Sequence, residues 1–246
     1  MECDLTDRVT VVTGAAAGIG LATAEVFVRH GARLALVDRD PRVAETAEVI
    51  GGGARAYALD VSDAVSVTKT FEAIAADFGT IHVLVNNAGI GILGPAESLA
   101  VADWDKTISV NLRGPFLCAR AAAPFMLRQK WGRVVTIASQ AAVIGIEGHV
   151  AYSASKAGLI GMTNCMAIEW GPFGVTANCI SPTVVETELA RVNWAGEKGE
   201  KARAGIPTRR FARPAEVAEA ALFLASDAAA MINGANLMLD GGNTIQ

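Results

Sequence analysis

The sequence predicts a doubly wound α/β fold, in which one parallel sheet of seven strands carries helices on both faces. Seven short, largely apolar runs alternate with longer segments that have helical character. Each run is bounded by Gly, Asp, Asn or Ser, as expected of strands that are buried on both faces. Strands that alternate with helices form βαβ units, and such units build a parallel sheet.

The expected elements follow in chain order. The predicted strands are Val9–Val12, Arg33–Val37, Arg55–Leu59, His82–Val85, Arg133–Ala138, Val175–Ile180 and Asn236–Leu239. The predicted helices are Ile19–Arg29, Val43–Ile50, Ala64–Phe78, Trp104–Arg128, Tyr152–Trp170 and Pro214–Leu224. We find no linker or repeat between them, so residues 1–246 are predicted to form a single domain.

One segment departs from this regularity. Residues 187–207 are polar and punctuated by glycine. Long irregular segments in compact domains are commonly lids or binding loops. We therefore expect a substrate lid around residues 187–210, with a surface excursion of no function as the alternative.

Composition narrows the functional classes. A chain of 246 residues with 52% hydrophobic and 19% charged residues has enough apolar surface for a large core. A net charge of −4 gives no basic surface for nucleic acid or an anionic membrane. No uninterrupted apolar run is long enough to predict a spanning helix, and the first residues do not resemble a secretory signal. The protein is expected in the cytoplasm, without nucleic-acid or membrane partners.

Metal and hydrolase chemistry find no support in the motifs. The cysteines show no CxxC pairing and the three histidines form no HExxH, so no metal site is predicted. The sequence also contains neither a GxSxG motif nor a Walker A loop, which argues against hydrolases and nucleoside triphosphatases.

A glycine-rich turn follows the first predicted strand and opens the first predicted helix. Its glycines are Gly14, Gly18 and Gly20, with Ile19 between the last two. Residues without a Cβ permit a tight turn and let a pyrophosphate approach the helix N–H groups. This placement predicts a dinucleotide site. A tight strand-to-helix turn without a ligand is the alternative.

The acidic residue at the end of the second predicted strand bears on the choice of dinucleotide. Asp38 lies 18 residues after Gly20, where a carboxylate accepts hydrogen bonds from the adenosine ribose and repels a 2′-phosphate. NAD is therefore expected rather than NADP. Arg39 is the opposing feature, because a guanidinium beside this pocket can bind a phosphate. Residues 15–17 are all alanine, so the turn supplies no second cation.

A tyrosine and a lysine are four residues apart, which is about one helical turn. Tyr152 and Lys156 therefore share one face of the predicted helix. A free phenol has a pKa near ~10, and a neighbouring ammonium lowers the pKa of a phenol. Ser139, thirteen residues before Tyr152, is placed to hold a substrate oxygen. The three residues together predict an acid/base site.

Taken together and in this order, these motifs resemble the short-chain dehydrogenase/reductase family over essentially the whole chain. The matching pieces are the glycine turn 13–20, Asn86 to Gly89, Asn111, Ser139, the Tyr152–Lys156 pair and the segment that begins at Pro182. The resemblance implies a Rossmann fold. It also implies hydride transfer between NAD(H) and a secondary alcohol or ketone.

The resemblance assigns four catalytic residues. Tyr152 is implied to be the acid/base, and Ser139 to orient the substrate oxygen and stabilise charge on it. Lys156 is implied to lower the tyrosine pKa and to bind the nicotinamide ribose. Asn111 is implied to hold a water through which Lys156 passes protons to solvent. A local kink or a solvated helix face is the alternative for Asn111.

The resemblance also implies a set of cofactor-binding residues. The adenine would contact Asp60 and Val61, although Asp60 also suits a helix cap. The full set is Gly14, Gly18, Ile19, Gly20, Asp38, Asp60, Val61, Asn87, Ala88, Gly89, Tyr152, Lys156, Pro182, Val185 and Thr187. The family more often has glycine after this proline, where the chain has Thr183.

The substrate is the least determined feature. Residues 181–185, Trp194, 206–207 and 210–212 are similar to the branch of xylulose reductases and polyol dehydrogenases, which implies a polyol/ketose pair. The candidate substrate residues are Ser139, Gln140, Glu147, Tyr152, Asn193 and Trp194.

Two alternatives stay open, and the assembly is implied only by resemblance. A 3-oxoacyl-thioester reductase is the first alternative, although such enzymes normally use NADPH, which Asp38 disfavours. A non-catalytic nucleotide-binding module is the second, and the presence of Ser139, Tyr152 and Lys156 argues against it. Members of the family are commonly homotetramers.

Overall fold

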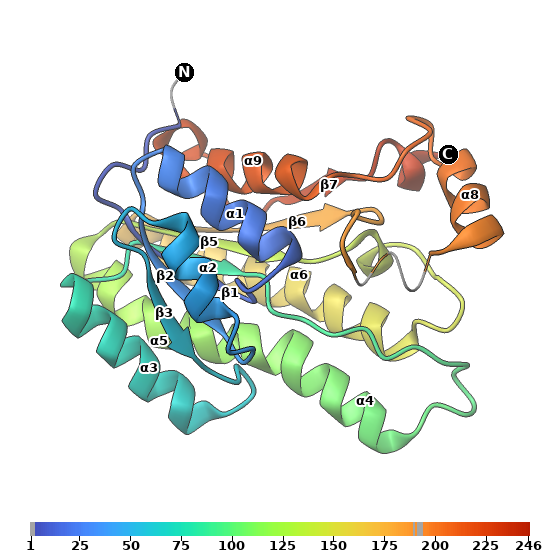
Figure 1. The fold of residues 1–246 in the computed structure, drawn as a ribbon, viewed down its shortest axis with the longest axis horizontal. Coiled ribbons are helices and arrows are strands. Elements are labelled where there is room, and N and C mark those ends of the chain that lie inside the picture. Colours follow the sequence, from blue (N-terminus) through green and yellow to red (C-terminus); the bar gives the residue numbers. More distant parts are fainter. Residues whose placement is uncertain (1–2, 189, 191–193) are drawn as a thin grey trace.

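Seven parallel strands form one sheet in the order β3-β2-β1-β4-β5-β6-β7 (Figure 1). The computed structural model describes residues 3–188, 190 and 194–246. The strands are β1 Val9–Thr13, β2 Arg33–Asp38, β3 Arg55–Ala58, β4 Val83–Asn86, β5 Gly132–Ile137, β6 Val175–Pro182 and β7 Asn236–Leu239. The predicted fold class is confirmed. The chain reverses its direction of progress between β1 and β4, which is where ligands bind in open parallel sheets.

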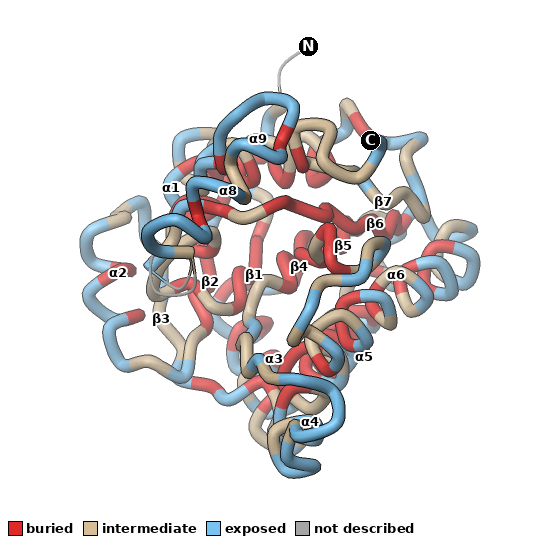
Figure 2. The backbone as a smooth tube through the Cα atoms, turned by 90° about the vertical axis from the view of Figure 1, so that its right-hand side faces the viewer, coloured by how far each residue is buried: buried red, intermediate tan, exposed pale blue. Residues whose placement is uncertain are grey.

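Helices cover both faces of this sheet (Figure 1). One core cluster joins the sheet to α1, α2 and α9, and a second joins it to α3, α5 and α6. The strands are buried between these layers, whereas the outer helix faces are exposed (Figure 2). The helices are α1 Gly18–Arg29, α2 Val43–Ile50, α3 Ala64–Phe78, α4 Val101–Ile108, α5 Gly114–Gln129, α6 Val150–Trp170, α8 Gly196–Gly205 and α9 Pro214–Ala225. Among the described residues, none of the helices has the length and apolar character needed to cross a membrane.

Residues 104–128 are helical, as predicted, but they are not α-helical throughout. Helix α4 ends at Ile108, a π-helical segment occupies Ser109–Arg113, and α5 begins at Gly114. Asn111 lies inside the π-helical segment and hydrogen-bonds through its side chain to the backbone of Ile90. An insertion of this kind is typical of functional sites, and a contact with a distant loop leaves no periodic signal in the sequence.

The predicted irregular segment is also partly helical, because α8 occupies Gly196–Gly205. Its residues are mostly Glu, Lys, Ala and Arg, which favour helices wherever the chain allows them. Helix α8 is thus a polar surface helix with little core of its own, and its helical character follows from propensity and not from an apolar stripe.

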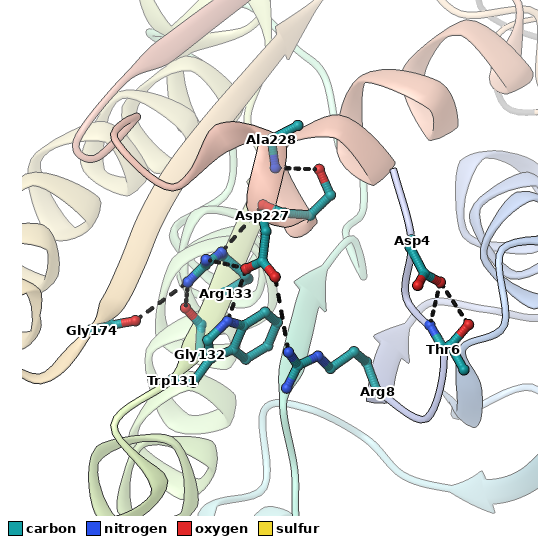
Figure 3. Close-up of polar contacts among 10 residues, drawn as sticks. Asp4, Thr6, Arg8, Trp131, Gly132, Arg133, Gly174, Asp227 and Ala228 are labelled. Carbon is teal, nitrogen blue, oxygen red and sulfur yellow. Dashed lines mark hydrogen bonds and ion pairs between the residues drawn. The ribbon is translucent and has the colours of Figure 1, made fainter. Parts of the chain in front are cut away.

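The amino ends of the strands are closed by a cluster of charged and aromatic side chains (Figure 3). The buried Arg133 guanidinium donates to the carbonyl of Gly174 at 3.3 Å and to an Asp227 carboxylate oxygen at 3.0 Å. The Trp131 indole N–H donates to the same oxygen at 3.0 Å, and Arg8 stacks 3.8 Å from the indole centroid. The guanidinium groups, the indole and the carboxylate thus have partners within the cluster. We therefore interpret this end of the sheet as structural and look for a functional site at the opposite end.

Candidate active site

A cavity of about 510 Å³ opens at the carboxyl ends of the strands. The described residues that line it include Ser139, Tyr152 and Lys156, which the sequence predicts to be catalytic. They also include every predicted cofactor residue except Gly20, which lies directly behind the cavity in the glycine turn. The segments after β1, β2, β3, β4, β5 and β6 therefore converge on one space.

The glycine turn is shaped by residues that tolerate no side chain. Gly14 and Gly18 adopt left-handed backbone with φ of 68° and 59°. A Cβ on Gly20 would collide with the carbonyl oxygen of Gly14, and one on Gly14 would lie 2.9 Å from the Cα of Ala88. No described side chain caps the first turn of α1, so its N–H groups face the cavity without a partner from a side chain. This cradle fits the pyrophosphate of a dinucleotide.

Asn87 ties the turn to the neighbouring strand. Its side-chain amide donates to the carbonyls of Thr13 and Gly14, at 3.0 Å each. The Thr13 hydroxyl in turn accepts from the backbone N–H groups of Asn87 and Ala88, at 3.1 Å each. Because both amide hydrogens of Asn87 serve the backbone, this side chain builds the cradle, and only its oxygen remains for a ligand.

The carboxylate of Asp38 is held in a fixed orientation at the end of β2. One oxygen accepts from the Ala16 N–H and the other from the Asp40 N–H, at 3.0 Å each. Arg39 is exposed and lines the cavity beside it. Arg42 also lines this end, a second cation that the sequence reasoning overlooked, but it pairs with Asp40 at 2.8 Å. The negative charge of Asp38 is therefore fixed in position, whereas Arg42, one of the two nearby cations, is already paired with Asp40.

Asp60 makes a local turn at the adenine end predicted from the sequence. Its carboxylate accepts from the Ser62 N–H at 2.9 Å and from the Ser62 hydroxyl at 2.7 Å. These bonds lower the pKa of Asp60 below its ordinary value. The cap of α3 is Asp63 and not Asp60. Val61 is buried in the cavity wall, as an apolar contact to a flat ring requires.

Helix α6 presents Tyr152 and Lys156 to the cavity from one face. The Lys156 ammonium donates to the carbonyl of Ile137 at 2.7 Å and lies 5.7 Å from the centroid of the Tyr152 ring. Only 5% of Lys156 is exposed, and burial lowers the pKa of its ammonium to about 8. Ser139 follows β5, and its hydroxyl accepts from the Ala141 N–H at 3.1 Å.

The phenol of Tyr152 behaves differently from the sequence expectation. Burial raises the pKa of Tyr152, and a hydrogen bond with Ser139 lowers it by less than burial raises it. The pattern of residues shows that an ammonium is near, but it does not show that both groups are taken out of water. Lys156 and Tyr152 therefore form a buried pair in which each charged form is costly.

Asn111 lies behind this pair and does not belong to the described cavity wall. Its amide oxygen accepts from the Ile90 N–H and its amide nitrogen donates to the Ile90 carbonyl, at 2.8 Å each. A Cβ placed on Gly89 would lie 3.4 Å from the Asn111 amide oxygen and 3.7 Å from the Lys156 ammonium. Asn111 thus fixes the loop after β4 close to Lys156, and its side chain has its main partners in that loop.

Comparison with known proteins decides the family. The family model described as enoyl-(acyl carrier protein) reductase matches residues 14–244. The chain is 51% identical to a D-threitol dehydrogenase of Mycolicibacterium smegmatis, covering 98% of this chain and 95% of that one. It is 44% identical to an NAD-dependent glycerol dehydrogenase of Listeria innocua, covering 100% and 97%. The chain belongs to the short-chain dehydrogenase/reductase family.

A solved structure supports the same assignment for this short-chain dehydrogenase/reductase. The crystal structure of a putative NAD(P)-dependent gluconate 5-dehydrogenase from Beutenbergia cavernae, with NADP bound at low occupancy, superposes with a TM-score of 0.95. It is 37% identical and the alignment covers 99% of each chain. The protein is thus an oxidoreductase that acts on CH–OH groups with a nicotinamide cofactor, and the cradle and cavity fit such a group.

The candidate substrate residues of this dehydrogenase are only partly brought together. Gln140 is buried in the wall, and its amide oxygen accepts from the Asn243 side chain at 3.1 Å. Trp194 lines the cavity and packs edge-on against Phe211, with centroids 6.4 Å apart. Asn193 lies outside the described residues. Glu147 is exposed and is not among the described residues that line the cavity.

His149, two residues after Glu147, is a side chain of this segment that reaches the cavity. It lines the cavity, and its ring lies edge-on to that of Tyr152 at 6.1 Å. Its Nδ1 is 2.7 Å from the Glu147 carbonyl, which can only accept, so Nδ1 carries the hydrogen and Nε2 is an acceptor in the neutral ring. The sequence reasoning missed this residue. Its spacing of three from Tyr152 was the available signal, since i and i+3 share a helix face.

Replacing Lys156 by Met is expected to stabilise the folded protein near pH 7, by about 2 kcal/mol. A pKa of about 8, against 10.5 for an ordinary lysine, means that folding disfavours the charged ammonium. The penalty is fully present below about pH 8 and disappears as the pH rises to about 10.5. The unpaired Ile137 carbonyl offsets about 1 kcal/mol of the gain. Urea unfolding near pH 7 and again near pH 10 measures the effect.

The matched control is Lys69→Met, which removes an exposed lysine of α3 and should leave the unfolding free energy unchanged. A Lys156→Met protein that is less stable near pH 7, or equally stabilised at both pH values, would contradict the buried-ammonium interpretation.

Proposed function

We propose that the enzyme interconverts a secondary hydroxyl and a ketone on a small polyol, with NAD as the preferred cofactor. The observation that carries this proposal is the convergence of Ser139, Tyr152 and Lys156 at a wall that also offers Gln140 and His149. The first three suit proton transfer at a carbinol. The last two offer a hydrogen-bond donor and an acceptor to further hydroxyl groups. Relatives named as threitol and glycerol dehydrogenases agree with this substrate class.

Each residue of the site has a proposed role in the reaction. Tyr152 takes the proton of the substrate hydroxyl during oxidation and returns it during reduction. The Ser139 hydroxyl holds the reacting oxygen and stabilises its developing charge. Lys156 keeps a positive charge beside the phenolate. Asn111, through the loop that it fixes next to Lys156, supports the proton path to solvent.

The cofactor would supply the hydride chemistry, accepting or donating the hydride at the carbon of the substrate. The glycine turn would hold the pyrophosphate, with Asp60 and Val61 beside the adenine. Pro182, Val185 and Thr187 line the cavity after β6 and would contact the nicotinamide. Gly18 and Thr187 are close neighbours, since a Cβ on Gly18 would lie 3.2 Å from the Thr187 methyl group. The proposed pyrophosphate and nicotinamide parts of the cofactor site are therefore close neighbours.

The preference for NAD is proposed from the fixed carboxylate of Asp38. Its two oxygens are oriented by backbone N–H groups and keep lone pairs for the ribose hydroxyls. A 2′-phosphate would meet this negative charge. Arg39 is the residue that would accommodate NADP, and Arg42 would first have to leave Asp40.

A lid over the substrate is proposed for residues 187–210. Trp194 from this segment lines the cavity, and Lys198 of α8 lies 4.8 Å from the Trp194 ring centroid. The last residue of the chain also reaches this segment, because the Gln246 amide donates to the Gly205 carbonyl at 2.6 Å. The position of Trp194 at the cavity and the bond from Gln246 to Gly205 support a cover that is held in place over the substrate.

A cytoplasmic homotetramer is proposed as the working assembly. Helices α5 and α6 expose Phe116 and Ile168, and an apolar groove of about 320 Å³ lies between them. Such faces are suited to burial against another copy. The four cysteines are free, in keeping with a reducing compartment. Light scattering should give a mass four times that of the 25.5 kDa chain, and a single-chain mass would contradict the assembly.

Tyr152→Phe is expected to lower kcat by about 10³-fold or more, because the acid/base group is lost. The affinity for NADH should change by less than about twofold, since the cradle is untouched. Rates are measured by NADH formation with a panel of C4 to C6 polyols, alongside 3-hydroxyacyl thioesters. Tyr57→Phe alters the other of the two tyrosines and serves as the matched control.

Comparable turnover in the Tyr152→Phe enzyme would remove the mechanism. A wild-type enzyme that oxidises the thioesters and none of the polyols would replace the proposed substrate class by the acyl-thioester alternative.

Asp38→Ala is expected to shift the ratio of kcat/KM for NAD over NADP towards NADP by about 10- to 100-fold. The estimate corresponds to the loss of charged hydrogen bonds to the ribose together with the loss of repulsion towards the phosphate. Initial rates with both cofactors measure it, with Asp105→Ala on the exposed face of α4 as the control. A wild-type enzyme that already prefers NADP would refute the role given to Asp38.

A further inference from the structure

A buried hydroxyl at the end of β6 has no partner among the described residues. Thr183 follows Pro182 and lines the cavity, and it is only 7% exposed. Its Oγ1 makes no hydrogen bond in the described parts of the chain. An unpaired buried hydroxyl costs about 1–3 kcal/mol, and most such groups in native proteins are satisfied. A group of this kind inside a cavity is placed to bind a ligand.

Four other described side chains also have a buried polar atom without a partner, but they lie elsewhere. They are Asn86, Thr136, Ser153 and Thr176. None of these four belongs to the cavity wall as the structure describes it. Thr176 is the closest match to Thr183, since it lies on β6, the strand that Thr183 directly follows, and is also 7% exposed. What distinguishes Thr183 is that a ligand can reach it.

The order of the strands brings Thr183 next to the segment that follows β5. Ile137 of β5 pairs with Ile180 of β6, and Gln140 and Thr183 each follow that pair by three residues, beyond the ends of these adjacent strands. On its other side, the Thr183 N–H donates to the Leu239 carbonyl of β7 at 3.1 Å. Thr183 thus lies between two neighbours. On one side is the segment after β5, which carries Ser139 and Gln140, and on the other is the carboxyl end of β7.

A residue that follows β7 determines which polar group Gln140 can offer to a ligand. The Asn243 amide nitrogen donates to the Gln140 amide oxygen at 3.1 Å. The Gln140 amide hydrogens are then left to donate elsewhere. A threonine hydroxyl both donates and accepts. The wall beside Ser139 therefore offers a fixed donor from Gln140 and an adaptable hydroxyl from Thr183, which is the pattern that a second hydroxyl group of a substrate requires.

We infer that Thr183 is a specificity-determining residue whose Oγ1 binds a second hydroxyl of the substrate, on the carbon next to the one that is oxidised. The inference rests on the proposed function. It narrows the substrate class to compounds with hydroxyls on neighbouring carbons. A site built to hydrogen-bond a substrate hydroxyl discriminates strongly against an analogue without it, because the buried group then stays unpaired.

The test compares 2,3-butanediol with 2-butanol, which share a carbon skeleton and differ in one hydroxyl. Thr183→Val keeps the shape of the side chain and removes the hydroxyl. It should lower kcat/KM for the diol by about 10- to 100-fold and leave that for 2-butanol within about twofold. Thr183→Ser should retain most of the activity on the diol. If 2-butanol is turned over too slowly, its inhibition constant against the diol replaces the rate and should not change.

Two further readouts separate a ligand contact from a structural role. The affinity for NADH, measured by fluorescence, should be unchanged in Thr183→Val. The melting temperature should be unchanged or higher, because the free protein loses an unpaired buried hydroxyl. Thr176→Val is the matched control, and it should behave similarly in melting while leaving both kcat/KM values unchanged.

Several results would overturn the inference. Equal losses on diol and alcohol, or weaker NADH binding, would place the Thr183 hydroxyl on the cofactor. Full activity of Thr183→Val on the diol would show that the hydroxyl binds nothing in the reaction. In both cases the wild-type enzyme still oxidises the diol, and the proposed function stands. A wild-type enzyme that oxidises no polyol would overturn the proposed function and the inference together.

Discussion

The site depends on one buried cation. Lys156 is held by the Ile137 carbonyl at 2.7 Å and lies beside the Tyr152 ring, and burial lowers the pKa of its ammonium to about 8. Burial also raises the pKa of the Tyr152 phenol. Burial thus disfavours the charged form of each group. The acid/base role proposed for Tyr152 requires phenolate to form beside the ammonium of Lys156.

The parallel sheet explains why this pair stands next to a cofactor cradle. Parallel strands direct all their carboxyl ends to one edge, where the glycine turn after β1 meets the residues after β4 and β5. Asn87 and Asn111 secure this edge by bonding to backbone, Asn87 to the turn and Asn111 to Ile90. At the opposite edge Arg133, Trp131 and Asp227 satisfy one another. One end of the sheet is thus stable and closed, and the other is available for chemistry.

Residues whose role depends on chain-local pattern could be predicted from the sequence. The apolar runs predicted the strands, and the four-residue spacing predicted a common helix face for Tyr152 and Lys156. The spacing of the glycines predicted the tight turn between the first strand and the first helix. What failed depends on distant partners. The π-helical segment Ser109–Arg113 contains Asn111, whose side chain bonds to Ile90, and the Gln140 amide oxygen accepts from Asn243.

The same limit applies to electrostatics and to substrate contacts. Charge proximity can be inferred from spacing, but the removal of Tyr152 from water cannot, and here burial has the larger effect on the phenol. Glu147 and His149 are two residues apart, and only the fold decides that His149 faces the cavity. Thr183 stood out in the sequence as a departure from glycine, and its burial without a partner is what gives that departure a chemical meaning.

The most direct measurement is the ultraviolet titration of the Tyr152 phenolate in the NAD-bound Tyr57→Phe enzyme. The chain has two tyrosines, so this variant leaves Tyr152 as the only tyrosine signal. Burial raises the pKa of the Tyr152 phenol, and we expect the positive charge of Lys156 to oppose this increase. Phenolate should therefore form at lower pH in this enzyme than in its Lys156→Met counterpart, and in step with the rate of alcohol oxidation. Phenolate that forms only at a pH where oxidation is already at its maximum, or that titrates identically in Lys156→Met, would contradict the account.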